Sequence, residues 1–232
     1  MDYEAAAKAL RGHAKPVKIE VYRTFFKNSQ EDVFVGVNVP ATRKVARDFR
    51  ELPLAEVHRL MRSKVHEERS LANEILRLKF NKGDDAAKEK IYQFYVKNLR
   101  HVREWDGVDG SAPYIVGPYL LRRDKGLLYK LARSSRLWDR RIAIVSTLAF
   151  IREGQVDDTM KIAEILLQDE EDLIHKAVGW MLREAGKSDL AALKRFLKTH
   201  GCNMPRTMLR YAIERFSKED RQRYLRETRP IS

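Results

Sequence analysis

The chain has 232 residues, of which 44% are hydrophobic and 34% are charged. This mixture is typical of a helix-rich globular protein and excludes extensive disorder. Lysine and arginine number 46 against 33 aspartates and glutamates, which leaves a formal charge of +13. Such an excess favours a polyanionic partner, with nucleic acid as the first candidate and an acidic membrane surface as the second.

Several classes of protein are disfavoured by what the sequence lacks. It has no run of about 18 apolar residues that could span a bilayer, and its first residues lack the apolar core of a secretory signal. Cys202 is the only cysteine, so we expect a reducing, cytoplasmic location in association with the nucleoid. The six histidines show no zinc-type spacing and no glycine-rich phosphate loop occurs, so we expect no metal, nucleotide or other cofactor.

Taken in chain order, the hydrophobic residues recur at spacings of three and four, which predicts amphipathic helices almost throughout. The only strand-like run, 33–39, is short and ends at Pro40. The helices are expected over 3–11, 17–26, 41–50, 54–62, 67–81, 84–99, 106–122, 124–132, 137–152, 157–167, 170–185, 188–199, 205–215 and 217–227.

A faint repeat lies within these helices. Residues 69–76 resemble residues 141–148, and residues 176–182 form a third copy. Each copy opens with a basic residue and continues into an apolar helix, at multiples of about 36 residues that suit two-helix HEAT units. The repeat predicts an all-α fold, an α-solenoid of HEAT-like repeats over 1–232 as a single domain, with a concave basic face. The alternative is that long helices often begin with a charged residue without any repeat.

The segment 105–109 combines an indole with carboxylates. Trp105 and Asp109 are four residues apart, so they share one face of a helix and could together hold a cation. The alternative is that Asp106 or Asp109 caps the helix beside a core tryptophan.

Three further positions have both a functional and a structural interpretation. Arg141 could bind a phosphate or could pair with an acidic neighbour on the surface. Trp180 is expected to pack, while Gly179 beside it would let another backbone approach. The basic segment 205–211 could attract an anion at a helix start, or could be an ordinary solvated helix end.

Together these segments resemble the AlkD-type family of DNA alkylation repair glycosylases over most of the chain. The resemblance rests on ordered motifs: Phe34-Val35-Gly36-Val37, Pro40-Ala41-Thr42-Arg43-Lys44, Trp105-Asp106-Gly107-Val108-Asp109 with Pro113 and Gly117, Leu137-Trp138-Asp139-Arg140-Arg141, Lys176-Ala177-Val178-Gly179-Trp180-Met181-Leu182-Arg183-Glu184, and Pro205-Arg206-Thr207-Met208-Leu209-Arg210-Tyr211-Ala212-Ile213.

The resemblance implies roles for individual residues. Asp109 matches the family's catalytic carboxylate, and Trp105 and Trp180 match two tryptophans that flank the deoxyribose of the lesion. Arg141 matches an arginine that grips the DNA backbone. We also expect DNA contacts from the following residues: Arg43, Lys44, Lys176, Arg206, Arg210 and Phe25.

Two positions depart from the family pattern. Glu104 stands where the family often has an aromatic residue. Phe25, with Tyr22 as the alternative, stands where the family often has a tyrosine. Gly107 and Gly110 also loosen the start of the expected catalytic helix, because glycine has a low helix propensity.

The sequence therefore predicts a monomeric glycosylase that excises N3- or N7-alkylated purines from double-stranded DNA without a metal or cofactor. Two alternatives are left open. One is a related protein that binds unusual DNA structures but cuts little, and the other is a HEAT adaptor that binds proteins. The intact Asp109 argues against the first, and the basic charge argues against the second.

Overall fold

The computed structural model describes residues 1–26 and 32–228, and helices dominate them. Its α-helices are α1 (Tyr3–Arg11), α2 (Ile19–Phe25), α3 (Val39–Asp48), α4 (Leu54–Met61), α5 (His66–Lys82), α6 (Asp85–Lys97), α7 (Trp105–Leu120), α8 (Gly126–Ala132), α9 (Leu137–Ser146), α10 (Leu148–Arg152), α11 (Asp157–Ile165), α12 (Asp172–Ser188), α13 (Leu190–His200), α14 (Arg206–Ala212) and α15 (Lys218–Glu227). Short 3₁₀ turns precede α2, follow α6 and follow α13. The all-α class predicted from the sequence is confirmed.

The expected strand over 33–39 is wrong. Val33 makes an isolated bridge with Val65, and α3 already begins at Val39. The backbone N–H groups of Val35, Gly36 and Val37 instead donate to the buried carboxylate of Glu67. This single side chain satisfies the donors that a neighbouring strand would otherwise have to satisfy.

The helix expected over 137–152 is divided into α9 and α10 at Thr147. Two buried hydroxyl groups bind backbone carbonyls at this point. Ser146 Oγ donates to the Ile142 carbonyl at 2.6 Å, and Thr147 Oγ1 donates to the Ile144 carbonyl at 2.6 Å. Such local bonds compete with the regular helical hydrogen bonds and bend or interrupt a helix.

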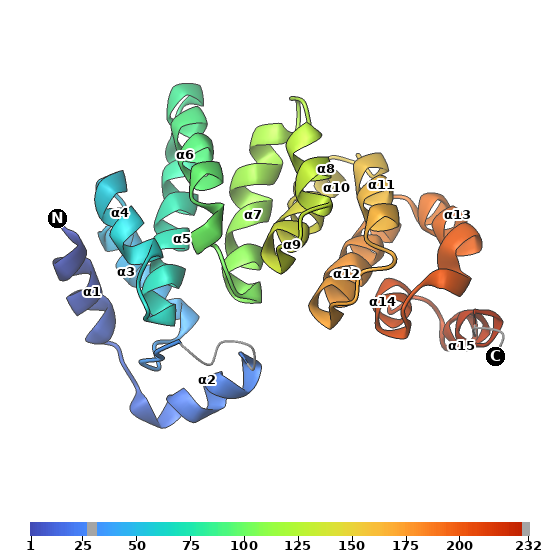
Figure 1. Cartoon of the computed structure of the whole chain (residues 1–232), viewed down its shortest axis with the longest axis horizontal. Coiled ribbons are helices and arrows are strands. Elements are labelled where there is room, and N and C mark those ends of the chain that lie inside the picture. The colour runs from blue at the N-terminus through green and yellow to red at the C-terminus, as the bar shows by residue number, and fades with distance from the viewer. Residues whose placement is uncertain (27–31, 229–232) are drawn as a thin grey trace. The chain divides into compact units, whose positions relative to one another are not determined.

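The chain forms two compact units, Met1–Ile115 and Val116–Ser232, and the boundary falls within α7. In the first unit α3, α4 and α6 pack against α5, while α1 contacts α3 and α4 (Figure 1). Helix α2 stands apart from these helices in the same unit, and its residues Val21 and Phe25 are exposed. In the second unit α12 packs against α9, α13 and α14. The single domain expected over 1–232 stays a prediction.

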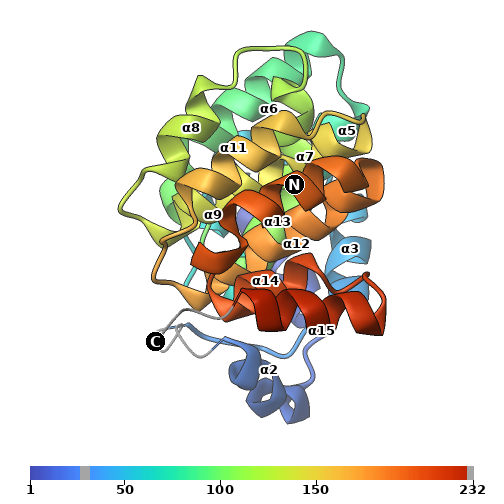
Figure 2. The same ribbon diagram turned by 90° about the vertical axis from the view of Figure 1, so that its right-hand side faces the viewer.

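Gly179 allows two helices of the second unit to approach closely. A Cβ atom at this position would lie 2.5 Å from the Met208 carbonyl oxygen and 2.5 Å from the Tyr211 Cβ. Helices α12 and α14 lie side by side (Figure 2). The sequence prediction that Gly179 admits another backbone is therefore confirmed.

We expect Gly179→Ala to lower the free energy of unfolding by about 1–3 kcal/mol, because the added methyl group must displace backbone atoms of α14. Gly110→Ala provides the matched control, since a Cβ at Gly110 meets nothing within 4 Å. That control should stabilise the protein by up to about 1 kcal/mol through helix propensity. Urea denaturation followed by circular dichroism measures both, and a Gly179→Ala protein as stable as Gly110→Ala would contradict the close approach.

Across residues 1–26 and 32–228, no helix combines the length and apolar character needed to cross a membrane.

Candidate functional site

The candidate site begins with the first turn of α7. Trp105 is the first residue of this helix, and Asp109 follows one turn later. Both residues are partly exposed, so neither belongs to the buried core of its unit. Residues four apart on a helix lie on the same side, so the indole and the carboxylate are neighbours on one surface.

The indole of Trp105 is held by the residues at the end of α2. Its Nε1 donates a hydrogen bond of 3.2 Å to the Phe25 carbonyl. The Phe26 ring stacks on the indole with a centroid distance of 5.5 Å and an interplanar angle of 11°. Phe26 also contacts the His66 ring at 4.4 Å, which links the indole to the start of α5.

A buried network of charged side chains lies beneath this first turn. Arg69 Nη2 on α5 is 2.6 Å from Asp32 Oδ2 and 3.0 Å from Glu104 Oε1. Arg103 binds the other Asp32 oxygen at 3.2 Å. His66 Nε2 lies 2.9 Å from Asp106 Oδ2, which ties α5 directly to the residue after Trp105. The network therefore fixes where α7 begins.

This network accounts for the glutamate at position 104, where the family often has an aromatic residue. Its side chain is buried, and its backbone φ of 59° lies in the left-handed region. Burial raises the pKa of Glu104 to about 7, and the neighbouring Asp32 adds to the rise while Arg69 opposes it. Burial lowers the pKa of His66, but the hydrogen bond and the charge of Asp106 outweigh it and leave that pKa raised.

These shifts predict a stability that falls as the pH rises. The pKa of Glu104 is about 7 against 4.5 for an ordinary glutamate, so between these values the folded protein binds more protons than the unfolded chain. The raised pKa of His66 acts in the same direction, because the stabilisation from its protonated form is lost as the pH rises past that pKa.

In the wild type, the free energy of unfolding should fall between about pH 4.5 and pH 7, and Glu104 should contribute at most about 3 kcal/mol to that fall. We expect Glu104→Gln to remove this contribution, so that the free energy of unfolding changes less with pH. Denaturant titrations at several pH values measure the slope. The exposed Glu219→Gln, outside the network, is the control and should keep the wild-type slope. An equal slope in Glu104→Gln and wild type would remove Glu104 from the pH dependence.

The same network contains a set of potential metal ligands. One donor atom each of Asp32, His66 and Glu104 lie within 4.8 Å of one another. However, the Arg69 guanidinium bridges the two carboxylates and neutralises part of their charge. A cation at the same place would have to displace this guanidinium, so the residues fit an ion-pair network better than a metal site.

Two of the three basic residues that open the sequence repeat are buried. Arg69 faces inward as described, and Arg141 is 5% exposed and donates from Nη1 to the Leu173 carbonyl. These two openings of the repeat therefore add little exposed charge to the surface. Only Lys176 is partly exposed, and its Nζ lies 2.7 Å from Asp172. The phosphate contact of Arg141 stays a prediction.

The other residues expected to contact DNA differ in their exposure. Arg43 and Lys44 are exposed on α3, where Arg43 Nε lies 3.2 Å from Glu74. Arg210 is exposed on α14. Arg206 instead donates to the Leu225 carbonyl at 3.0 Å and so links α14 to α15. Phe25 is 62% exposed.

Trp180 belongs to the second unit. It is partly exposed on α12, and with Leu148, Ile151 and Lys187 it lines a cavity of about 500 Å³. Trp105 and Asp109 belong to the first unit, whereas Trp180 and Arg141 belong to the second.

The sequence interpretation missed the buried acidic residues that organise the site. Asp32 pairs with Arg69, and Glu67 binds the backbone of the residues that precede α3. Glu104 pairs with Arg69 at the start of α7. Nothing in the local pattern distinguishes these carboxylates from solvated ones, because their partners lie far away along the chain. Glu104 was noticed only as a departure from the family pattern.

The model of the family described as DNA alkylation repair enzyme matches residues 6–216. A similar solved structure is a predicted DNA alkylation repair enzyme from Enterococcus faecalis, with a TM-score of 0.71 and 17% identity over 89% of this chain and 98% of that one. The curated proteins contain no match. Because the family model spans nearly the whole length, the chain belongs to the DNA alkylation repair enzyme family.

Proposed function

We propose that this protein is a DNA glycosylase that hydrolyses the N-glycosidic bond of purines alkylated at N3 or N7 in duplex DNA. The observation that carries the proposal is the partly exposed Asp109 one helical turn after Trp105, in a chain of the DNA alkylation repair enzyme family. A carboxylate beside an indole suits a reaction in which positive charge develops on a sugar.

The chemistry follows from the charge of the substrate. Alkylation at N3 or N7 makes the purine cationic, so the base departs as a neutral molecule when it takes the electrons of the bond to C1′. The sugar then acquires oxocarbenium character, as in glycoside hydrolysis. A water oxygen adds to C1′, and its proton passes to Asp109 or to solvent. The Asp109 anion stabilises the transition state more than the ground state, which is the requirement for catalysis.

The aromatic residues have a supporting role in this proposal. Trp105 would contact the deoxyribose through its ring face, and Trp180 is proposed as a second aromatic contact. A single cation–π contact contributes about 0.5–2 kcal/mol, depending on desolvation. The hydrogen bond to Phe25 and the stacking on Phe26 keep the Trp105 ring ordered before substrate arrives.

Binding of DNA is proposed to depend on exposed basic residues and on α2. Lys44 and Arg210 are exposed, and Arg43 and Lys176 retain exposed charge beside one acidic partner each. Cations of this kind bind phosphates without reading the base sequence. The ring of Phe25 is exposed, and Phe25 comes in the chain directly before the residue that stacks on Trp105, which supports a proposed contact with the nucleic acid near the reacting sugar.

A comparison of cationic and neutral lesions tests the proposal. Duplexes of one sequence carry either 7-methylguanine or the neutral base hypoxanthine at the same position, and released base is measured under single turnover. We expect release of 7-methylguanine only, because the neutral base is a poor leaving group and the site supplies no strong acid. Binding without release of either base would favour a DNA-binding protein that does not cut, and equal release would contradict the charge-driven mechanism.

A further inference from the structure

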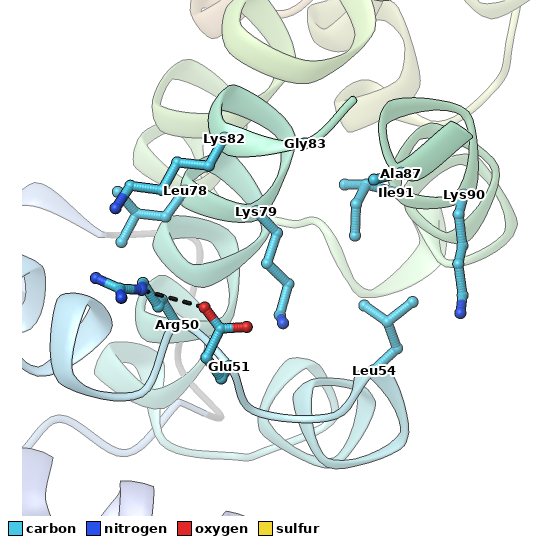
Figure 3. Close-up of a pocket in the computed structure, with 10 residues that line it drawn as sticks. All are labelled: Arg50, Glu51, Leu54, Leu78, Lys79, Lys82, Gly83, Ala87, Lys90 and Ile91. Carbon is cyan, nitrogen blue, oxygen red and sulfur yellow. Dashed lines mark hydrogen bonds and ion pairs between the residues drawn. The ribbon is translucent and has the colours of Figure 1, made fainter. Parts of the chain in front are cut away.

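A second cavity lies in the first unit, where the connection between α3 and α4 meets the turn between α5 and α6 (Figure 3). Its volume is about 320 Å³, which falls at the lower end of the range for ligand pockets, about 300–1,000 Å³. Gly83 forms the turn, and a Cβ there would lie 2.8 Å from the Ala87 Cβ. We call this cavity the α5–α6 pocket.

The charges around the α5–α6 pocket are strongly unbalanced. Four cations line it, namely Arg50, Lys79, Lys82 and Lys90, against the single carboxylate of Glu51. Glu51 already pairs with Arg50 at 3.1 Å. Among residues 1–26 and 32–228, the three lysines take part in no ion pair.

The lysine at the centre of the group is partly withdrawn from water. Burial lowers the pKa of Lys79, Glu51 opposes the fall, and the positive charge of Lys90 adds a smaller decrease. Figure 3 shows the Lys79 side chain extending from α5 toward Glu51 and Leu54. An anion in the pocket would further stabilise the charged form of Lys79, which burial disfavours.

The remaining lining of the pocket is apolar. Leu54, Leu78 and Ile91 come from three different helices and face the same cavity. The phosphates of a DNA backbone would bind the cations, but the backbone carries no projecting apolar side chain that could fill this cavity. An acidic peptide that carries an aromatic or branched side chain offers both a charge for the lysines and an apolar group for the floor.

The pocket is separate from the candidate catalytic residues. His66 contacts Asp106 at the first residue of α5, whereas Lys79 lies 13 residues further along the same helix. At about 1.5 Å per residue this places the two ends roughly 20 Å apart along the axis. The α5–α6 pocket therefore lies outside the candidate site on α7.

We propose that the α5–α6 pocket binds an acidic segment of a partner protein, anchored by one large apolar side chain. The lysines select the charged residues of the segment and steer its approach, and Leu54, Leu78 and Ile91 receive the anchor. The inference does not depend on glycosylase activity, because none of these residues contributes to the site on α7.

Fluorescence anisotropy with a labelled peptide tests the proposal on the full chain. The probe is fluorescein-Gly-Asp-Glu-Asp-Asp-Leu-Phe, with a Phe→Ser peptide and a peptide of Asn and Gln in place of the acids as comparisons. We expect Lys79→Glu/Lys90→Glu to weaken binding of the first peptide at least tenfold. The control Lys8→Glu/Lys130→Glu carries the same change of net charge at exposed positions outside the pocket and should retain binding.

The remaining measurements separate this site from the DNA-binding surface. The pocket variant should release 7-methylguanine at the wild-type rate and should bind an undamaged duplex as well as the control variant does. Both altered peptides should bind more weakly than the first. Equal binding of the first peptide by the wild type, the pocket variant and the control variant would overturn the proposal. So would a tenfold loss of duplex affinity confined to the pocket variant with peptide binding unchanged, since the lysines would then form a DNA surface.

Discussion

Asp109→Asn is expected to abolish release of 7-methylguanine or 3-methyladenine while leaving DNA affinity largely intact. The substitution keeps the shape of the side chain but removes the negative charge that the proposed mechanism places beside the sugar. Removing one preorganised electrostatic group from an active site typically lowers the rate by about 10²–10³-fold. The contribution is made in the transition state, so the loss should appear in the rate of the chemical step and not in binding.

Single-turnover base release on a methylated duplex measures this effect, with affinity determined separately by anisotropy. Asp157→Asn is a matched control, because Asp157 is exposed on α11 and lies outside the candidate site. Thermal melting of both variants shows whether the fold is retained. Base release by Asp109→Asn at the wild-type rate would make the catalytic assignment wrong, and equal loss of binding and release would indicate a role in docking.

Arg69→Met is expected to destabilise the protein by about 3–5 kcal/mol. The substitution removes the cation that lies between Asp32 and Glu104 and leaves two buried carboxylates close together. An unpaired buried charge is costly because its lost hydration is not replaced. Since both carboxylates support the start of α7, we also expect weaker ordering of Trp105, visible as a red shift of tryptophan fluorescence that is absent when Trp105 is replaced by phenylalanine.

Arg103→Met is the control for Arg69→Met, since both arginines bind Asp32. The Arg103 side chain is 40% exposed against 4% for Arg69, so water can replace much of its interaction. We expect a loss of about 1 kcal/mol or less for Arg103→Met. Guanidinium denaturation measures both variants. Equal losses would mean that burial does not determine the strength of these pairs.

The sequence predicted the helices well because their signal is local. Apolar residues at spacings of three and four mark each helix, and α12 and α5 show this directly. The division at Thr147 was not predicted, because the apolar pattern continues across it and only the hydroxyl bonds of Ser146 and Thr147 interrupt the helix. The false strand at 33–39 arose because a run of valines also suits a loop whose N–H groups bind Glu67.

The candidate site was predicted in part. The spacing of Trp105 and Asp109 placed both on one side of α7, as any helix requires. The surroundings of the pair could not be predicted in the same way. The Asp32–Arg69 bond joins residues 37 apart, and Tyr95 reaches Ser111 across 16 residues. Charged residues such as Arg141 and Glu104 look like surface residues until their burial is known.

The amino-acid sequence by itself determined three things: the helical class, the excess of positive charge, and the pairing of an indole with a carboxylate one helical turn apart. Each of these is set by composition or by spacings within a single helix. Only the tertiary structure decided which charges are available to a ligand. Arg69 and Arg141 are enclosed between helices, whereas Lys79 and Lys90 gather around a cavity. The physical reason is that the hydration of a charge depends on the helices packed around it, and that packing joins residues far apart in the chain.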